Sequence, residues 1–110
     1  MKMAGSLAAS VVDQIKAQVQ KLVEKHYVFI VFDLTRVDFI DSSGLGLCIA
    51  TSRELAACSG LLVCAGLQAN AQRLFAMTKA DQKIKVLPTR LEAFDFMLER
   101  VEETSAGKFA

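Results

Sequence analysis

Apolar residues recur at helical spacing in four segments of the chain. In the first segment they are Val11, Val12, Ile15, Val19, Leu22 and Val23, which share one face of a helix. Ser10 is the predicted N-cap of this helix, and Ser6 is nearly as good a candidate. The helical segments are residues 6–26, 44–60, 68–80 and 90–101. Gly60 is the predicted stop of the second, and Pro88 the predicted opening of the last.

Three short apolar runs lie between these helices, at residues 27–34, 61–66 and 83–87. The first, YVFIVFDL, is rich in β-branched and aromatic residues and shows no alternation, which is typical of a strand buried on both faces. Strands that alternate with helices form a parallel sheet with helices packed against it. The pattern therefore predicts an α/β fold with a short, mainly parallel sheet, whose central strand lies near residues 28–34.

Length and composition fit one packed domain, residues 1–110, with residues 1–5 and about 103–110 predicted to be frayed. The chain is 53% hydrophobic and 23% charged, which favours a globular fold over disorder. Its formal net charge of +1 gives no bias towards nucleic acid or acidic membranes. No apolar run approaches the roughly 18 residues of a membrane span. The first ten residues lack the apolar stretch of a secretory signal. We therefore expect a cytoplasmic protein without a nucleic-acid partner.

The residue types needed for catalysis or metal binding are poorly supplied. Cys48, Cys58 and Cys64 match no zinc or redox spacing and are predicted to be reduced and unbridged. The only histidine, His26, precedes the first apolar strand and is predicted to be a solvated helix-end residue. A Ser-His-Asp triad with the serines that follow the strand is therefore not expected. We expect no enzyme activity, cofactor or metal.

The segment FIDSSGLG, residues 39–46, is the best candidate for function. It lies where the first apolar strand hands over to a helix, at the edge of a parallel sheet that usually holds functional sites. The spacing of Gly44 and Gly46 fits neither a dinucleotide loop nor a P-loop, and neither serine fits a nucleophile elbow. Asp and Ser are preferred N-cap residues, so capping alone could explain them. The same helix start also favours an added phosphate, which makes a phosphorylation switch the alternative.

The stretch from Val31 to Ala80 resembles the bacterial anti-sigma-factor antagonists of the STAS family. The resemblance covers roughly residues 5–100 and is most specific in the DSSGLG core, followed by a Gly-ending helix, an apolar strand and AQRLFAMT. It implies a protein-binding module without catalysis that sequesters an anti-sigma factor and so frees a sigma factor. The anti-sigma factor would be a serine kinase of the GHKL type, and a PP2C-type phosphatase would reset the switch.

The resemblance also assigns residues. It implies that Ser42 is the phosphoacceptor, with Ser43 the runner-up. The predicted partner-binding residues are Asp41, Ser42, Ser43, Gly44, Leu45 and Gly46.

The N-terminal segment departs from the family, whose members usually open with two strands before the first helix. Here only AGSLAA is recognisable, and Ala8 stands where the family has an acid. We therefore expect the N-terminal strands to be missing and a sheet edge near YVFIVF to be uncovered, which would favour homodimers. Two alternatives remain open. One is a STAS scaffold domain of a sensory or transport system, and the other a small enzyme or nucleotide binder, although no nucleotide-binding loop is present.

Overall fold

The computed structural model describes the backbone of residues 1–104 and 108–109, and the side chains of residues 1–101. Strands and helices alternate along the chain, as the hydrophobic pattern predicts. The elements are β1 (Lys2–Leu7), α1 (Ala9–Glu24), β2 (Tyr27–Ile40), α2 (Ser42–Ala57), β3 (Leu61–Ala65), α3 (Ala69–Met77), η1 (Ala80–Gln82), β4 (Lys85–Leu87), α4 (Arg90–Thr104) and β5 (Lys108–Phe109).

The strands form one parallel sheet in the order β1-β2-β3-β4, which confirms the predicted fold class. β2 is the long central strand, and it pairs with β3 only up to the register Asp33↔Ala65. Beyond that point β2 continues alone with β1, up to Leu7↔Ile40. The carboxyl ends of the strands are therefore staggered, with β1 and β2 projecting past β3 and β4.

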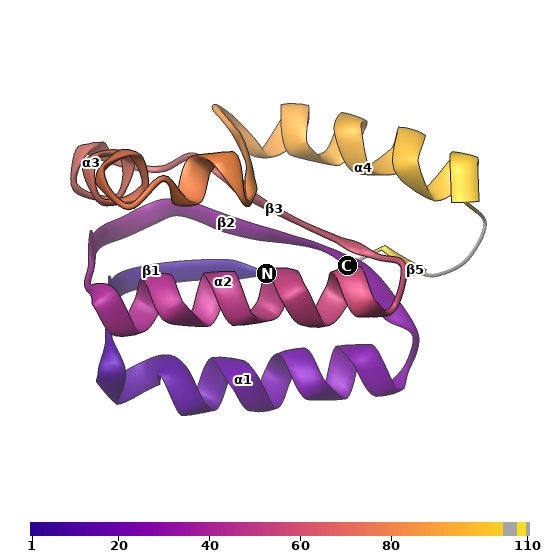
Figure 1. Cartoon of the computed structure of the whole chain (residues 1–110), viewed down its shortest axis with the longest axis horizontal. Coiled ribbons are helices and arrows are strands. Elements are labelled where there is room, and N and C mark those ends of the chain that lie inside the picture. Colours follow the sequence, from indigo (N-terminus) through magenta and orange to yellow (C-terminus); the bar gives the residue numbers. More distant parts are fainter. Residues whose placement is uncertain (105–107, 110) are drawn as a thin grey trace.

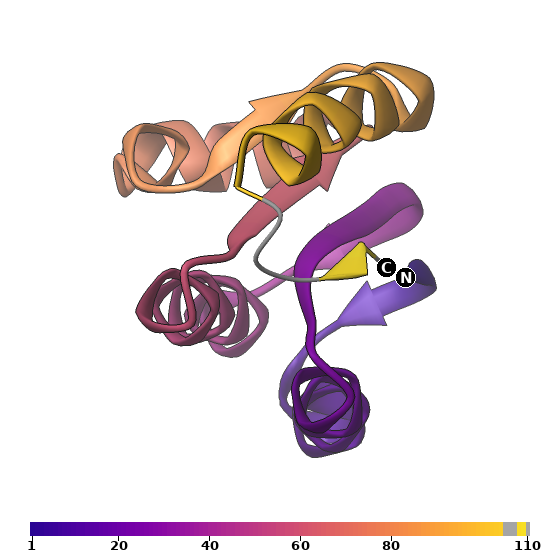
Figure 2. The same ribbon diagram turned by 90° about the vertical axis from the view of Figure 1, so that its right-hand side faces the viewer.

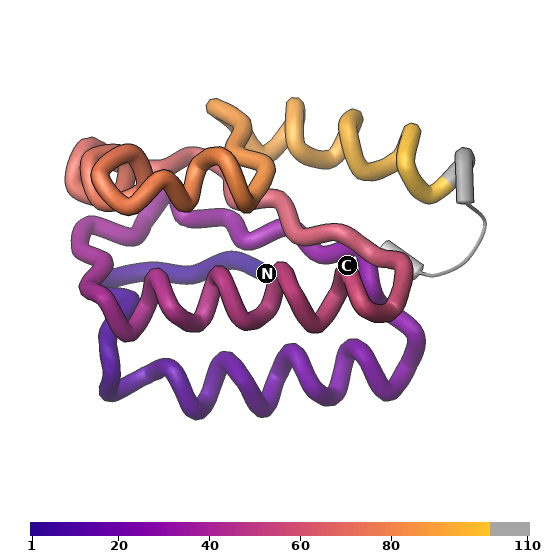
Figure 3. Tube along the Cα trace, viewed as in Figure 1, coloured from indigo at the N-terminus to yellow at the C-terminus, as the bar shows by residue number. Residues whose placement is uncertain are grey.

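The helices cover both faces of the sheet. α1 and α2 lie side by side below the sheet in the view of Figure 1, and α4 lies above it. α3 lies across the end of the sheet at which β2 finishes, and Figure 3 traces the chain from each strand through a helix to the next. The core between these layers is built on the β2 run Val28–Phe32, whose side chains are all buried. Continuous burial explains why this run shows no alternation.

β1 corrects two predictions about the start of the chain. Residues 2–7 form a strand paired in parallel with β2, so at least one strand does precede the first helix, and the predicted fraying of residues 1–5 is wrong. The strand is mostly exposed and contains Gly5 at φ 78°, so its sequence carries little strand signal. The N-cap of α1 is Ala8, without a side-chain hydrogen bond, and neither Ser10 nor Ser6 has that role.

The C-terminal segment also differs from the prediction of a frayed tail over about residues 103–110. α4 extends to Thr104, and β5 pairs in parallel with the first residues of β2. Residues 105–107 and 110 of that tail lie outside the described residues. β1 and β5 occupy successive stretches of the same side of β2, so the edge near YVFIVF that we expected to be uncovered is paired. This removes the physical basis for dimerisation through that edge.

Gly60 follows α2 for a reason that differs from the predicted one. α2 ends at Ala57, and it is Ser59 that takes the left-handed conformation, at φ 62°. A β-carbon on Gly60 would come within 2.0 Å of the Val28 carbonyl oxygen, because the chain passes directly against β2 there. Gly60 is thus required by close packing of backbone on backbone.

Candidate functional site

The turn from β2 into α2 is closed by Asp41, which is the N-cap of α2. Its Oδ1 accepts a hydrogen bond from the backbone N–H of Gly44 at 3.0 Å, and its carbonyl oxygen accepts one from Leu45 at 3.0 Å. Asp41 has the extended backbone conformation usual for an N-cap, with φ −106° and ψ −174°. Asp41, Ser42 and Ser43 are all suited to capping, but only Asp41 caps α2.

Ser42 and Ser43 form the first two positions of α2, and both are exposed. Within residues 1–101, neither hydroxyl takes part in a hydrogen bond. The two serines are therefore not needed to hold the turn. Both stand at the positive end of a 16-residue helix, where a negative group is favoured.

Gly44 fixes the turn against the end of β1. A β-carbon at Gly44 would lie 2.1 Å from the carbonyl oxygen of Leu7 and 2.9 Å from Cγ1 of Ile40. The same Leu7 oxygen accepts a hydrogen bond from the Asp41 N–H at 3.4 Å. β1 thus supports the turn formed by Asp41, Ser42 and Ser43, which we call the serine turn.

The remaining predicted partner-binding residues divide by exposure. Gly44 is buried and Leu45 is 6% exposed, so these two shape the turn from inside. Gly46 is exposed, with open space where a β-carbon would stand. The surface available to a partner therefore consists of Ser42, Ser43 and Gly46, beside a half-buried Asp41.

α3 supplies a contact that sequence reasoning missed. The side-chain oxygen of Asn70 accepts a hydrogen bond from the backbone N–H of Ile40 at 2.9 Å. Gln68, the N-cap of α3, donates from Nε2 to the carbonyl oxygen of Thr35 at 2.8 Å. The second half of β2 is therefore tied to α3 as well as to β1, and the serine turn is held from two sides.

Phe39 is a second residue that sequence reasoning did not single out. It lies on β2 beside Ser6 of β1 and is 46% exposed, unlike most large apolar side chains of the described part. An aromatic ring this exposed, two residues before Asp41, is suited to contact with another protein. The signal in the sequence is an aromatic residue between Asp38 and a buried Ile40.

The three cysteines are free. Cys48 of α2 and Cys64 of β3 are buried, and Cys58 is exposed. A hydrogen bond with Cys48 and burial together raise the pKa of the Cys64 thiol well above its ordinary value. His26 is exposed at the start of β2, with φ 69°, at the opposite end of the strand from Ser42. The structure therefore does not bring it near the serines.

The chain belongs to the STAS domain family. A family model for the STAS domain matches residues 1–93, which include the serine turn and every strand of the sheet except β5. No match is found among curated proteins.

Solved structures with similar folds include regulators and a transporter-related protein. The anti-sigma factor antagonist SpoIIAA in its unphosphorylated form is 25% identical, with a TM-score of 0.78 over 89% of this chain and 85% of that chain. The phosphorylated form of the Bacillus cell fate determinant SpoIIAA is 26% identical, with a TM-score of 0.67 over 86% and 85%. A sulfate transporter family protein from Wolinella succinogenes is 15% identical, with a TM-score of 0.81 over 93% and 85%, a likeness of fold alone.

In the described part of the chain, every helix is too short or too polar to cross a bilayer.

Proposed function

We propose that this protein is an anti-sigma-factor antagonist whose binding to its partner is controlled by phosphorylation of Ser42. The observation that carries the proposal is the exposed pair of serines at the start of α2, on a turn that Asp41 already caps. A residue that is free of structural duty can be modified without loss of the fold. Membership of the STAS family and similarity to both forms of SpoIIAA support the same function.

In the proposed cycle, the unphosphorylated protein binds an anti-sigma factor that is also a GHKL-type serine kinase, and the sigma factor is released. The kinase then transfers the γ-phosphoryl group of ATP to Oγ of Ser42, which gives phosphoserine and ADP. A PP2C-type phosphatase hydrolyses the phosphoserine and restores the binding form. The protein itself acts as a cytoplasmic bacterial binding module, without catalysis or a cofactor of its own.

The effect of phosphate follows from charge at an interface. Phosphoserine brings about −1.5 to −2 charges next to Asp41. Removing water from that charge at a packed partner surface costs free energy, and the charge also repels any partner carboxylate near the helix start. We expect a loss of about 2–4 kcal/mol, or roughly 30- to 1,000-fold in affinity. Phe39 is the apolar anchor of the proposed surface, since it is exposed on the strand that leads into the turn.

The test is phosphorylation by the cognate kinase with ATP, mapped by mass spectrometry, together with calorimetric binding of both forms. We expect phosphate on Ser42, strong binding of the unphosphorylated protein and weak binding of the phosphorylated one. Ser42→Ala should remain bound permanently, and Ser42→Asp should imitate release only in part. Ser43→Ala is the matched control and should behave as the unchanged protein does. Phosphate on Ser43 alone would show that Ser43, and not Ser42, is the phosphorylation site. Equal affinities of the phosphorylated and unphosphorylated forms for the partner would contradict a phosphorylation switch.

A second candidate function is a STAS interaction domain of a sensory or transport system. It is favoured by the similarity of fold to the Wolinella sulfate transporter family protein. In that case the serine turn would bind a partner without releasing a sigma factor. The kinase assay separates the two, because a chain with this second function should not be a substrate of an anti-sigma factor kinase.

A further inference from the structure

A cleft of about 480 Å³ opens on the sheet, away from the serine turn. It lies where β3 and β4 have ended and β2 continues with β1, because Asp33 is level with the last residue of β3. Crevices beyond the carboxyl ends of parallel strands are the usual ligand sites of such sheets. The lining residues are Lys2, Met3, Ala4, Asp33, Thr35, Arg36 and Arg90.

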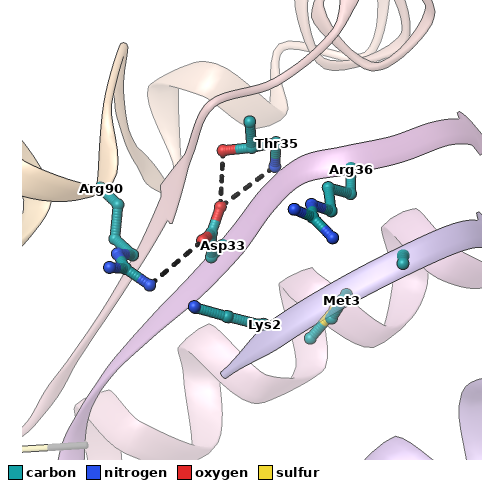
Figure 4. Close-up of a pocket in the computed structure, with 7 residues that line it drawn as sticks. Lys2, Met3, Asp33, Thr35, Arg36 and Arg90 are labelled. Atoms are coloured by element: carbon teal, nitrogen blue, oxygen red, sulfur yellow. Dashed lines mark hydrogen bonds and ion pairs between the residues drawn. The ribbon is translucent and has the colours of Figure 1, made fainter.

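Three cations and one carboxylate line this cleft. Figure 4 shows Arg90 approaching Asp33 from the α4 side and Lys2 approaching from β1, while Arg36 extends from β2, the strand that also carries Asp33. Arg90 forms an ion pair with Asp33, the one acidic residue of the lining. Lys2 also interacts electrostatically with Asp33, so three cations share one carboxylate among the lining residues. The cleft therefore carries an excess of positive charge, although the whole chain is close to neutral.

The one carboxylate is largely engaged elsewhere. Oδ1 of Asp33 accepts hydrogen bonds from the Thr35 hydroxyl at 2.6 Å and from the Thr35 N–H at 3.1 Å. Oδ2 lies 4.0 Å from Nη1 of Arg90, which is too long for a hydrogen bond. Asp33 and Arg90 thus interact by charge, and the guanidinium donors of Arg90 are not hydrogen-bonded to Asp33.

Arg90 is also held in position. Its guanidinium carbon lies 5.4 Å from the centre of the Phe94 ring, one turn further along α4. This cation–π contact reduces the freedom that the side chain would lose on binding a ligand. Arg90 is moreover the first residue of α4, whose start has a partial positive charge.

We propose that this cleft binds a small multivalent oxyanion, such as a phosphorylated metabolite. Arginine forks bind phosphate and carboxylate groups bidentately. Here two arginines and a lysine, from β2, α4 and β1, line the same cleft. The volume lies in the range of small-molecule pockets, about 300–1,000 Å³. No aromatic residue is among those that line the cleft, so its lining favours a ligand recognised by its charge. The register places the cleft near Lys2 and the serine turn near Leu7, so the two sites are separate.

The test uses the unphosphorylated protein and needs no kinase. Pyrophosphate is titrated at low salt by calorimetry and by NMR shifts of the backbone amides of residues 33–36. We expect Arg36→Gln and Arg90→Gln each to weaken binding by roughly tenfold, and the double variant to abolish it. Arg53→Gln, an exposed arginine on α2, is the matched control and should change affinity less than about twofold. Asp33→Asn should bind more tightly, because it removes the only negative charge of the lining.

Binding of citrate, and binding of vesicles made of phosphatidylcholine with phosphatidylserine, are measured to distinguish the possible sources of the oxyanion. Preference for pyrophosphate over citrate would identify a phosphate ligand, and the reverse a carboxylate ligand, and either supports the site if the arginine variants lose it. Binding to vesicles without binding to either soluble anion would overturn the proposal. Absence of binding at low salt, or an equal loss in Arg53→Gln, would do the same. Circular dichroism of each variant checks that the fold is retained.

Discussion

Asn70 of α3 accepts a hydrogen bond from the backbone N–H of Ile40, the last residue of β2, at 2.9 Å. This contact joins two segments thirty residues apart and holds the strand end that precedes the serine turn. The position of Ser42 therefore depends on the packing of α3 as well as on the sequence around the serines.

Replacing Asn70 by alanine should leave the partly buried Ile40 N–H without its acceptor. We expect the free energy of unfolding to fall by about 1–3 kcal/mol, and the Ile40 amide to exchange faster with solvent. Asn70→Asp is the matched control, because it keeps an acceptor oxygen. Urea denaturation and NMR hydrogen exchange measure the two effects. Unchanged exchange at Ile40 in Asn70→Ala would show that the contact does not hold the turn.

Gly44 and Gly46 should respond oppositely to the same change. Gly44→Ala forces a β-carbon against the Leu7 carbonyl, and we expect a loss of about 3 kcal/mol or a shift of the first turn of α2. Gly46→Ala places a methyl group in open space inside a helix, and we expect a gain of about 0.5–1 kcal/mol. Urea denaturation of both variants provides the comparison. Similar stabilities would contradict the packing of α2 on β1.

Capping should be lost with Asp41 and not with Ser42. Asp41→Ala removes the acceptor for the Gly44 N–H, and we expect a cost of about 0.5–2 kcal/mol. Ser42→Ala should change stability by less than about 0.5 kcal/mol, since an exposed side chain without a structural contact is replaced. Thermal and urea unfolding measure both. A large loss in Ser42→Ala would mean that the hydroxyl has a structural role.

Asp33 should make stability depend on pH. Burial raises its pKa, but the two hydrogen bonds from Thr35 and the nearby Arg90 and Lys2 outweigh burial and hold the pKa below its usual range. A depressed pKa stabilises the folded state above the unfolded value of about 3.9, and this stabilisation is lost as pH falls through the folded pKa. The stability difference between the unchanged protein and Asp33→Asn, measured by urea denaturation across pH, should thus be constant near neutrality and shrink below about pH 4.

The control for this measurement is Asp38→Asn, which alters an exposed carboxylate on the same strand. It should show a much smaller difference at every pH. If the Asp33 difference persisted undiminished in acid, its origin would be packing and not charge.

The thiols should differ in reactivity. Cys58 is exposed and should react with a thiol reagent in the native protein, whereas Cys48 and Cys64 are buried and should react only on unfolding. The raised pKa of Cys64 further lowers its thiolate fraction. Freshly reduced protein in denaturant should yield all three thiols. A fast reaction of more than one thiol before unfolding would contradict the packing of α2 on β3.

The elements predicted correctly from sequence are those whose apolar side chains are all buried or all lie on one face of the element. Val28–Phe32 is recognisable because a continuous run of β-branched and aromatic residues is typical of a strand covered on both faces. β1 escapes sequence reasoning because Lys2, Ala4 and Ser6 are exposed, and its pairing with β2 is visible only in the folded chain. A strand of this kind exists because of its neighbour.

The sequence singles out a candidate site, but it does not assign the structural roles of the residues within that site. Asp41, Ser42 and Ser43 are all good caps, and the choice among them is made by the backbone angles of the turn. The sequence does not distinguish the roles of Gly44 and Gly46. In the structure they differ because Gly44 packs against the Leu7 carbonyl and Gly46 faces open space. The cleft at Asp33 combines residues from β1, β2 and the start of α4, and no spacing in the sequence indicates it.

The contact between Gly44 and Leu7 has a consequence for which substitutions the fold accepts. A glycine is demanded at this place by the route of two backbones, whatever the domain does. The serines beside it are under no such demand. Substitution of Ser42 or Ser43 should therefore be compatible with the fold, whereas substitution of Gly44 should not. The glycine is thus a mark of the architecture, whereas the serines bear on the proposed phosphorylation.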